Sequence, residues 1–226
     1  GRYAHAKSAG MKGFIAIIKK YGEFPKNEKV RKENWWKWWK SKGKYQDREI
    51  FKRKFIKTPE RNTDLAELCG IIIGDGGITR RQVKITLNCE TDRIYSEYVM
   101  KLLTKLFDVK PSIYNIKGNK ALNICISRSD LVDFLVKQGL KLGNKLKQNV
   151  SIPQWIMKSQ KYVFPCVRGM MDTDGCVVLE IHRIKNKNYT YCRLNFTSAS
   201  PALVDQVVHV LETAGFHPKI RRGGRS

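Results

Sequence analysis

Several features that would restrict the function are missing from this chain of 226 residues. No apolar run approaches the ~20 residues needed to cross a bilayer, and residues 1–5 open no hydrophobic signal segment. The six cysteines stand singly without a CxxC pair, and the four histidines show no zinc-ligand spacing. These absences argue against a membrane protein and a structural zinc site, and they predict a reduced, intracellular protein.

Acidic residues are also scarce. The 20 Asp and Glu face 44 Lys and Arg, which gives a net charge of +24. With 42% hydrophobic residues and 7 prolines, the chain has the composition of a folded protein and not of a disordered basic tail. So large a charge repels itself in a compact fold, and therefore indicates an anionic partner. Nucleic acid is the favoured partner, and a merely soluble basic domain is the alternative.

Residues 1–62 hold 19 Lys and Arg against 6 Asp and Glu, so 13 of the 24 net charges lie in just over a quarter of the chain. We expect helices from about residue 14 to residues 21–22 and over residues 26–42, with Pro25 and residues 57–59 as boundary signals. The second helix contains Trp35, Trp36, Trp38 and Trp39. We interpret these tryptophans as a small core under a basic surface. Contact with nucleic acid is the alternative.

From residue 63 the pattern changes to alternating helices and strands. We predict helices over residues 64–74, 92–107 and 129–138, a strand over 80–88, and a hairpin of 110–116 with 120–127 turning at Gly118–Asn119. Ser129 is the expected cap of the third helix and Gly139 its end. The order then restarts with a helix over 163–172, strands over 177–183 and 189–197 around a polar turn at 185–188, a helix over 200–213 ending at Gly215, and a strand beginning at 217.

The predicted fold is therefore α/β (α+β): two pseudo-symmetric αββαββα repeats behind a basic helical N-terminal extension. The extension covers residues 1–62, the first repeat 63–160, and the second repeat 161–226. The second repeat lacks its second hairpin and closing helix, so we expect a longer natural protein or a second polypeptide that supplies them. Gly223–Gly224 fits a hairpin turn or a flexible loop.

Two segments of the repeats, residues 68–76 and 167–175, align with each other. Each is an apolar helix that ends in Asp-Gly, at Asp75 and at Asp174. Small residues four apart, Gly70 with Gly74 and Gly169 with Thr173, leave a groove that allows two helices to approach closely. We expect the final Gly76 and Gly175 to form left-handed caps.

An aspartate at a helix C-terminus is unfavourable, because the helix dipole is already negative there. If the two helices pack together, Asp75 and Asp174 repel each other as well. A cation between them removes this conflict, and carboxylate oxygens suit Mg²⁺, which completes its shell with water and phosphate oxygens. The sequence therefore predicts a magnesium site at these two aspartates.

The paired motifs resemble the signature motifs of the LAGLIDADG homing endonucleases in their single-chain, two-repeat form, over roughly residues 63–226. The resemblance implies a metal-dependent endodeoxyribonuclease that cuts both strands of a long duplex site, as intron-encoded members do. Asp75 and Asp174 then bind metal and catalyse, and the carbonyls of Gly74 and Thr173 reach the metal. The metal is Mg²⁺, for which Mn²⁺ or Ca²⁺ can substitute. The resemblance also places Lys145, or alternatively Lys147, near the scissile phosphate.

The resemblance further implies that strand residues read double-stranded DNA from a saddle in the major groove. The corresponding positions are Arg80, Gln82, Lys84, Thr86 and Asn88 in the first repeat, and Glu180, His182, Arg193, Asn195 and Thr197 in the second. Arginine suits guanine, and Gln or Asn suits adenine. Each position can equally be a solvated strand face. For the whole chain, the alternative function is an RNA-splicing maturase or a non-cleaving DNA-binding protein of the same fold.

Overall fold

The computed structural model describes residues 11–16, 18–19, 28–45, 55–116, 118–145 and 147–221. The chain divides into two compact units, Gly1–Lys52 and Arg53–Ser226. Pro25, the predicted helix end at residues 21–22 and the Gly223–Gly224 pair lie outside the described residues. Nowhere in the described ranges is a helix both long enough and apolar enough to cross a membrane.

In the first unit, residues 11–16 are helical, α2 covers Glu28–Ser41, and the short 3-10 helix η1 follows at Gly43–Tyr45. The prediction of a helix over residues 26–42 is confirmed by α2. The interpretation of its tryptophans as a buried core is wrong. Trp35 is 47% exposed and Trp36 is 54% exposed, and no residue from 29 to 42 is buried. The helix is too rich in lysine, and too poor in other apolar side chains, to cover its own indoles.

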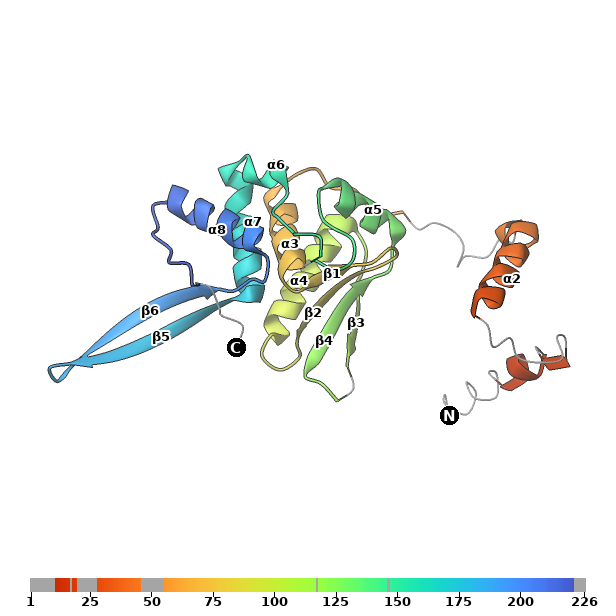
Figure 1. Ribbon diagram of the computed structural model, residues 1–226, viewed down its shortest axis with the longest axis horizontal. Helices are drawn as coiled ribbons and strands as arrows, with labels where there is room; N and C mark the ends of the chain where they lie inside the picture. The colour runs from red at the N-terminus through yellow and green to blue at the C-terminus, as the bar shows by residue number, and fades with distance from the viewer. Residues whose placement is uncertain are drawn as a thin grey trace. The chain divides into compact units, whose positions relative to one another are not determined.

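The second unit contains the complete first repeat (Figure 1). Its elements are α3 (Thr63–Gly74), β1 (Gly76–Ile78), β2 (Val83–Asn88), α4 (Arg93–Phe107), β3 (Ser112–Asn115), β4 (Ala121–Ile126) and α5 (Ser129–Lys137). The predicted αββαββα order of this repeat is confirmed. After α6 (Gln154–Met157) come α7 (Gln160–Asp174), β5 (Gly175–Ile184), β6 (Lys187–Phe196) and α8 (Pro201–Thr213). The mixed helix and strand fold with antiparallel sheets is therefore as predicted.

The four strands of the first repeat form one antiparallel sheet in the order β1-β2-β4-β3. One face is apolar because alternate residues of each strand point to the same side. Val83, Ile85 and Leu87 of β2 are buried with Ile124 and Ile126 of β4 in a single core, which also contains apolar residues of α3, α4 and α5. The opposite face carries the polar residues.

Helix α3 lies in the middle of this core. It begins after Asn62, whose side chain accepts a hydrogen bond from the Leu65 amide at 2.8 Å. Every residue from Leu65 to Gly74 is buried. A helix that is apolar on all sides must be covered on all sides, and α7, α4 and the sheet provide that cover.

Two local predictions in the first repeat are wrong, the start of a strand and the cap of a helix. The strand predicted from residue 80 begins at Val83, because Thr79 and Gln82 close a turn in which the Thr79 amide donates to the Gln82 carbonyl at 2.8 Å. Arg80 and Gln82 therefore lie in the β1–β2 turn. Ser129 is the first residue of α5 and not its cap; the cap position is Arg128, which makes no side-chain capping bond.

The glycines after the two motif aspartates are not left-handed caps. Gly175 is extended, and neither Gly76 nor Gly175 is among the residues with positive φ. Glycine is needed for space: a Cβ on Gly76 would lie 2.5 Å from the Ile72 Cα atom, and one on Gly175 would meet the Met171 carbonyl. Residues 217–221 also form no strand, contrary to prediction, since no neighbouring strand pairs with them.

In the second repeat, β5 and β6 form a two-stranded hairpin that extends beyond the helices (Figure 1). The turn needs two residues, Lys185 and Asn186, both with positive φ, as in the tight hairpin turns that match strand twist. One face of the hairpin is apolar and exposed, with Leu179 and Ile181 each 69% exposed. The other face carries polar side chains.

Candidate functional site

The two motif helices, α3 and α7, pack at backbone distance because of their small residues. A Cβ on Gly70 would meet the Cys166 carbonyl, and a Cβ on Gly169 would meet the Glu67 carbonyl. These two contacts are equivalent in the repeat alignment, since Glu67 corresponds to Cys166 as Gly70 does to Gly169. The helices therefore pack with pseudo-twofold symmetry, as the small-residue spacing predicts.

The same symmetry brings the C-terminal ends of the helices together. A Cβ on Gly74 would meet the Thr173 hydroxyl and would lie 3.4 Å from Oδ2 of Asp174. Asp75 is the residue that caps α3, and Asp174 is the last residue of α7. The two predicted catalytic aspartates thus lie at neighbouring helix ends, half-buried, where each helix dipole disfavours their charge.

A threonine in β2 and a threonine directly after β6 hold the backbone of the two aspartates. The Thr86 amide donates to the Asp75 carbonyl at 3.1 Å, and the Thr197 amide donates to the Asp174 carbonyl at 3.2 Å. Both threonines were predicted to contact DNA from the strand rows. In the structure their amides also hold the backbone of the two aspartates where each motif helix ends, so both threonines help to position the carboxylates.

The electrostatics of the pair follow from burial and proximity. Burial, then the charge of Asp174, raises the pKa of Asp75 to about 6, while Lys145 opposes the shift. Burial also raises the pKa of Asp174, again against Lys145. The pKa of Lys145 is lowered by burial, which the two aspartates oppose. The three predicted groups therefore share one half-buried region, in which Lys145 lowers the pKa of both aspartates and both aspartates raise the pKa of Lys145.

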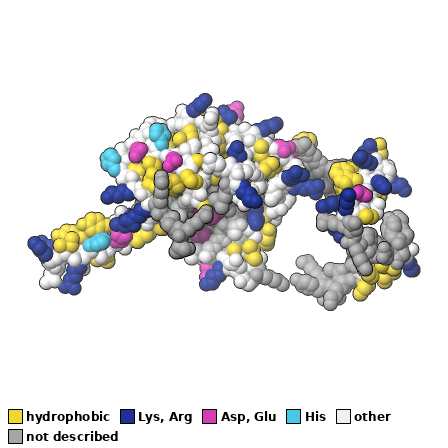
Figure 2. Space-filling model, viewed as in Figure 1, with side chains coloured by type: hydrophobic (Ala, Val, Ile, Leu, Met, Phe, Trp, Pro, Cys, Tyr) yellow, Lys and Arg dark blue, Asp and Glu magenta, His cyan; other side chains and the backbone are white. Residues whose placement is uncertain are grey.

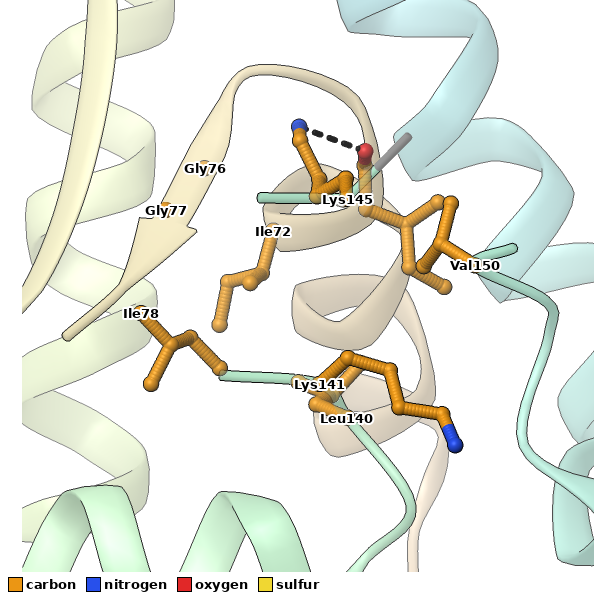
Figure 3. Close-up of a pocket in the computed structure, with 9 residues that line it drawn as sticks. Ile72, Gly76, Gly77, Ile78, Leu140, Lys141, Lys145 and Val150 are labelled. Carbon is orange, nitrogen blue, oxygen red and sulfur yellow. Dashed lines mark hydrogen bonds between the residues drawn. The ribbon is translucent and has the colours of Figure 1, made fainter. Parts of the chain in front are cut away.

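Lys145 reaches this region from the loop that follows α5 (Figure 3). Its Nζ atom donates to the Ile73 carbonyl at 2.8 Å and to the Gly74 carbonyl. These carbonyls belong to the last turn of α3, where a cation is favourable. A small hollow beside it is lined mainly by apolar residues: Ile72, Ile73, Ile78, Leu140 and Val150. Lys147, the alternative choice, is exposed.

The donor set suits a hard divalent ion. Two carboxylates that repel each other favour a cation, and Mg²⁺ needs only one or two carboxylates in addition to water and phosphate oxygens. Among the described residues, no group of three or more His, Cys, Asp or Glu side chains could hold a metal by itself. The Gly74 carbonyl bonds to Lys145, and the Thr173 hydroxyl donates to the Gly169 and Met170 carbonyls at 3.0 Å. The residues therefore fit a metal ion that takes its remaining donors from water and phosphate oxygens.

A polar network beside the site was missed by sequence reasoning. Glu67 is almost fully buried in α3, pairs with Arg168 of α7, and accepts a hydrogen bond from the Tyr98 hydroxyl of α4 at 2.7 Å. A buried carboxylate needs such partners. The signal in the sequence is a glutamate inside an apolar helix, but the sequence does not reveal its partners because they lie on other elements.

In the first repeat, Lys84, Thr86 and Asn88 of the predicted row share one face of the sheet, whereas Arg80 and Gln82 lie in the turn before β2. Gln82 donates to the Cys125 sulfur at 3.2 Å, and the Thr86 hydroxyl donates to the Asn123 side chain at 2.8 Å. The Asn88 side chain accepts from the Glu90 and Thr91 amides, so its carbonyl oxygen is used in a local turn. Lys84 and Arg80 are exposed. The register adds Tyr114 and Asn123 to this face. The alternation of residues 120–127 could have indicated Asn123, whereas Tyr114 follows only from the pairing of β3 with β4.

The second predicted row is also on one face. Glu180, His182, Arg193 and Asn195 all lie on the polar side of the β5–β6 hairpin by register. Arg193 pairs with Glu180 at 2.8 Å, and His182 lies 3.2 Å from the same carboxylate. Tyr189 and Tyr191 belong to this side and were not predicted. In the space-filling view, apolar side chains extend along this hairpin and basic side chains gather at its tip (Figure 2).

Comparison with known families decides the relationship. Residues 162–226, which begin in α7 and include Asp174, match the family model described as a LAGLIDADG-like domain. This segment, which contains the second motif, is similar to LAGLIDADG-like domains. The resemblance inferred from the paired motifs is confirmed at the level of the family. The matched residues include the end of the motif helix α7 at Asp174.

Solved structures of LAGLIDADG proteins are also similar to this chain. The meganuclease I-AabMI bound to uncleaved DNA is 15% identical, with a TM-score of 0.46, over 70% of this chain and 74% of that one. I-DmoI in complex with DNA and Mn is 17% identical, with a TM-score of 0.43, over 68% and 78%. Meganuclease I-SmaMI bound to uncleaveable DNA is 13% identical, with a TM-score of 0.42, over 70% and 71%.

Proposed function

We propose that the chain is a site-specific DNA endonuclease of the homing type, which binds a long duplex site and hydrolyses phosphodiester bonds on both strands with a divalent metal. The observation that carries the proposal is the pairing of Asp75 with Asp174 at the ends of two packed helices, with the pKa of Asp75 raised. A protein that only binds DNA has no use for two half-buried carboxylates, because they repel an anionic ligand.

Asp75 and Asp174 are the proposed metal ligands, with the carbonyls of Gly74 and Thr173 as further donors. Mg²⁺ is the expected ion, and Mn²⁺ or Ca²⁺ can occupy the same oxygen site. When bound, the ion supplies a Lewis acid that activates water and stabilises charge on the leaving oxygen. Lys145 keeps a positive charge beside the carboxylates and is placed to stabilise a scissile phosphate. It must release the Gly74 carbonyl before that oxygen can bind metal.

The strand faces are the proposed DNA interface. Gln82 and Lys84 in the first repeat, and Arg193 and Asn195 in the second, have the side chains that recognise base edges in the major groove. In this proposal residues 63–160 and 161–226 each read one half of the site, while residues 1–62 add charge.

The test is cleavage of a plasmid library that carries randomised duplex inserts, followed by sequencing of the cut ends. With Mg²⁺ the wild-type protein should cut a defined site, and Asp75→Asn or Asp174→Asn should abolish cutting while duplex affinity is unchanged or improved. Asp172→Asn is the matched control, because it removes an acid from the same end of α7 without touching the pair. That variant should still cut.

Two results would change the proposal. Full cleavage by Asp75→Asn or Asp174→Asn would remove the site assignment. Tight binding of DNA by the wild-type protein, with no cutting in Mg²⁺ or Mn²⁺, would support the alternative function, an RNA-splicing maturase or a non-cleaving DNA-binding protein.

A further inference from the structure

Helix α2 of the first unit presents an aromatic surface that the proposed cleavage does not use. Trp35 and Trp39 stack with ring centroids 5.7 Å apart and planes 4° apart, and Trp36 packs edge-on to Trp35 at 5.2 Å. Trp35, Trp36 and Trp38 are nevertheless exposed. The indoles hold one another in place, and large ring faces remain open to solvent.

The 3-10 helix η1, which follows α2, packs against the indoles of Trp38 and Trp39. Gly43 is buried, and a Cβ on it would lie 2.6 Å from the Trp39 ring and 2.7 Å from the Trp38 ring. Only a glycine lets the backbone of η1 lie against these two indoles. Their positions are therefore fixed before any ligand arrives, which lowers the entropy that binding must overcome.

Basic residues lie among the indoles. Residues 28–45 contain seven Lys and Arg and two Glu. Arg31 precedes Trp35 by four residues, and Lys40 follows Trp36 by four, so positive side chains stand beside the indoles at both ends. In the space-filling view, dark-blue side chains surround the yellow side chains of this helix (Figure 2). A helix that inserts into a membrane surface separates these two kinds of residue on opposite faces, which α2 does not do.

We propose that α2 binds single-stranded nucleic acid, with the exposed indoles of Trp35, Trp36 and Trp38 stacking on unpaired bases and the neighbouring Lys and Arg binding phosphates. Aromatic rings next to cations are the features that bind single strands without sequence preference. In a duplex the bases stack on one another, so few base faces are free to stack on the indoles. This inference goes beyond the proposed cleavage and does not depend on it.

The test compares the full chain with its Trp35→Ala/Trp36→Ala variant in fluorescence anisotropy on labelled oligo(dT), oligo(rU) and a duplex. Affinity for both single strands should fall roughly tenfold or more, while duplex affinity changes less than about twofold. Phe216→Ala is the matched control, because it removes an exposed aromatic side chain from the second unit. Unchanged single-strand affinity, or an equal loss on duplex, would overturn the proposal. A preference for oligo(rU) over oligo(dT) would identify RNA as the ligand.

A second measurement covers the case in which the double variant loses its helix. Trp155 is the fifth tryptophan, so Trp155→Phe leaves only the indoles of α2 as emitters. Oligo(dT) should quench their fluorescence, whereas polyphosphate, which has charge but no bases, should not. Equal quenching by polyphosphate, or stronger binding to anionic lipid vesicles than to oligonucleotides, would contradict base stacking.

Discussion

Asp75 ionises where burial and a second carboxylate oppose its charge. Its pKa is raised to about 6 from an ordinary 3.8, so its contribution to stability is complete below about pH 4 and is lost as the pH rises through 6. In metal-free buffer the protein should be less stable at pH 7.5 than at pH 5. Asp75→Asn should recover on the order of 1 kcal/mol at pH 7.5, a value reduced for the solvent that screens a half-exposed group.

Urea unfolding in EDTA at the two pH values measures this effect. Asp205→Asn, which changes an exposed aspartate on α8, is the control and should leave the pH dependence of the wild type in place. If Asp75→Asn retains the wild-type difference in unfolding free energy between pH 5 and pH 7.5, then Asp75 is not the titrating group.

Gly169 is one of the two glycines on which the close approach of the motif helices depends. A Cβ there would meet the Glu67 carbonyl and lie 3.0 Å from the Ile71 amide nitrogen, both backbone atoms that cannot yield without moving a helix. Gly169→Ala should therefore destabilise the protein by roughly 3 kcal/mol. Gly77→Ala, where nothing lies within 4 Å of the new Cβ, should be neutral or slightly stabilising. Equal unfolding free energies for the two variants would contradict this account of the packing.

The β5–β6 hairpin has a polar face and an apolar face, and the contribution of each face to DNA binding can be tested separately. Arg193 lies on its polar face, paired with Glu180, and Leu179 lies on its apolar face. If the polar face binds DNA, Arg193→Ala should lower affinity for the cognate duplex by about tenfold to a hundredfold, the expected cost of losing a base-edge contact. Leu179→Ala, an exposed change on the same strand pair, should have little effect in the same mobility-shift assay. The reverse order of effects would place the DNA on the apolar face.

The order of the elements could be predicted because periodicity and turn residues are local signals. The positions of α3, α4 and both hairpins follow from them within a few residues. Strand β1 was not predicted separately, because three residues carry no alternation. Left-handed glycine caps were expected at Gly76 and Gly175 from chain position alone, whereas the actual reason for glycine there is a steric contact with the preceding helical turn.

In the candidate site, too, some features follow from local sequence signals and others only from tertiary packing. Asp75 and Asp174 could be found because the motif occurs twice, and Lys145 could be chosen because of the family resemblance. That Lys145 bonds to the carbonyls of Ile73 and Gly74 depends on how a loop folds back over α3, which no spacing encodes. The Glu67, Arg168 and Tyr98 network joins three helices, so it exists only after tertiary packing.

For the whole molecule, the net charge of +24 sets how binding should respond to salt. Each phosphate that the protein neutralises releases condensed counterions. With about eight phosphates bound, log K should fall with log[salt] at a slope of about −7 or steeper. Titrations of the cognate duplex at several KCl concentrations give the slope. A value near −2 would mean that most of the charge serves another partner.

The backbone contact between α3 and α7 has a consequence for protein engineering. Because Gly70 and Gly169 each face a carbonyl of the opposite helix, the close approach at this joint depends on the absence of side chains at those positions, and the Glu67–Arg168 pair adds one specific contact across it. A half from a relative should dock without redesign of the remaining core if it has small residues at the positions of Gly70, Gly74, Gly169 and Thr173 and keeps the Glu67–Arg168 pair. The two halves should therefore be exchangeable, and chimaeras of halves from different relatives should assemble around the same joint.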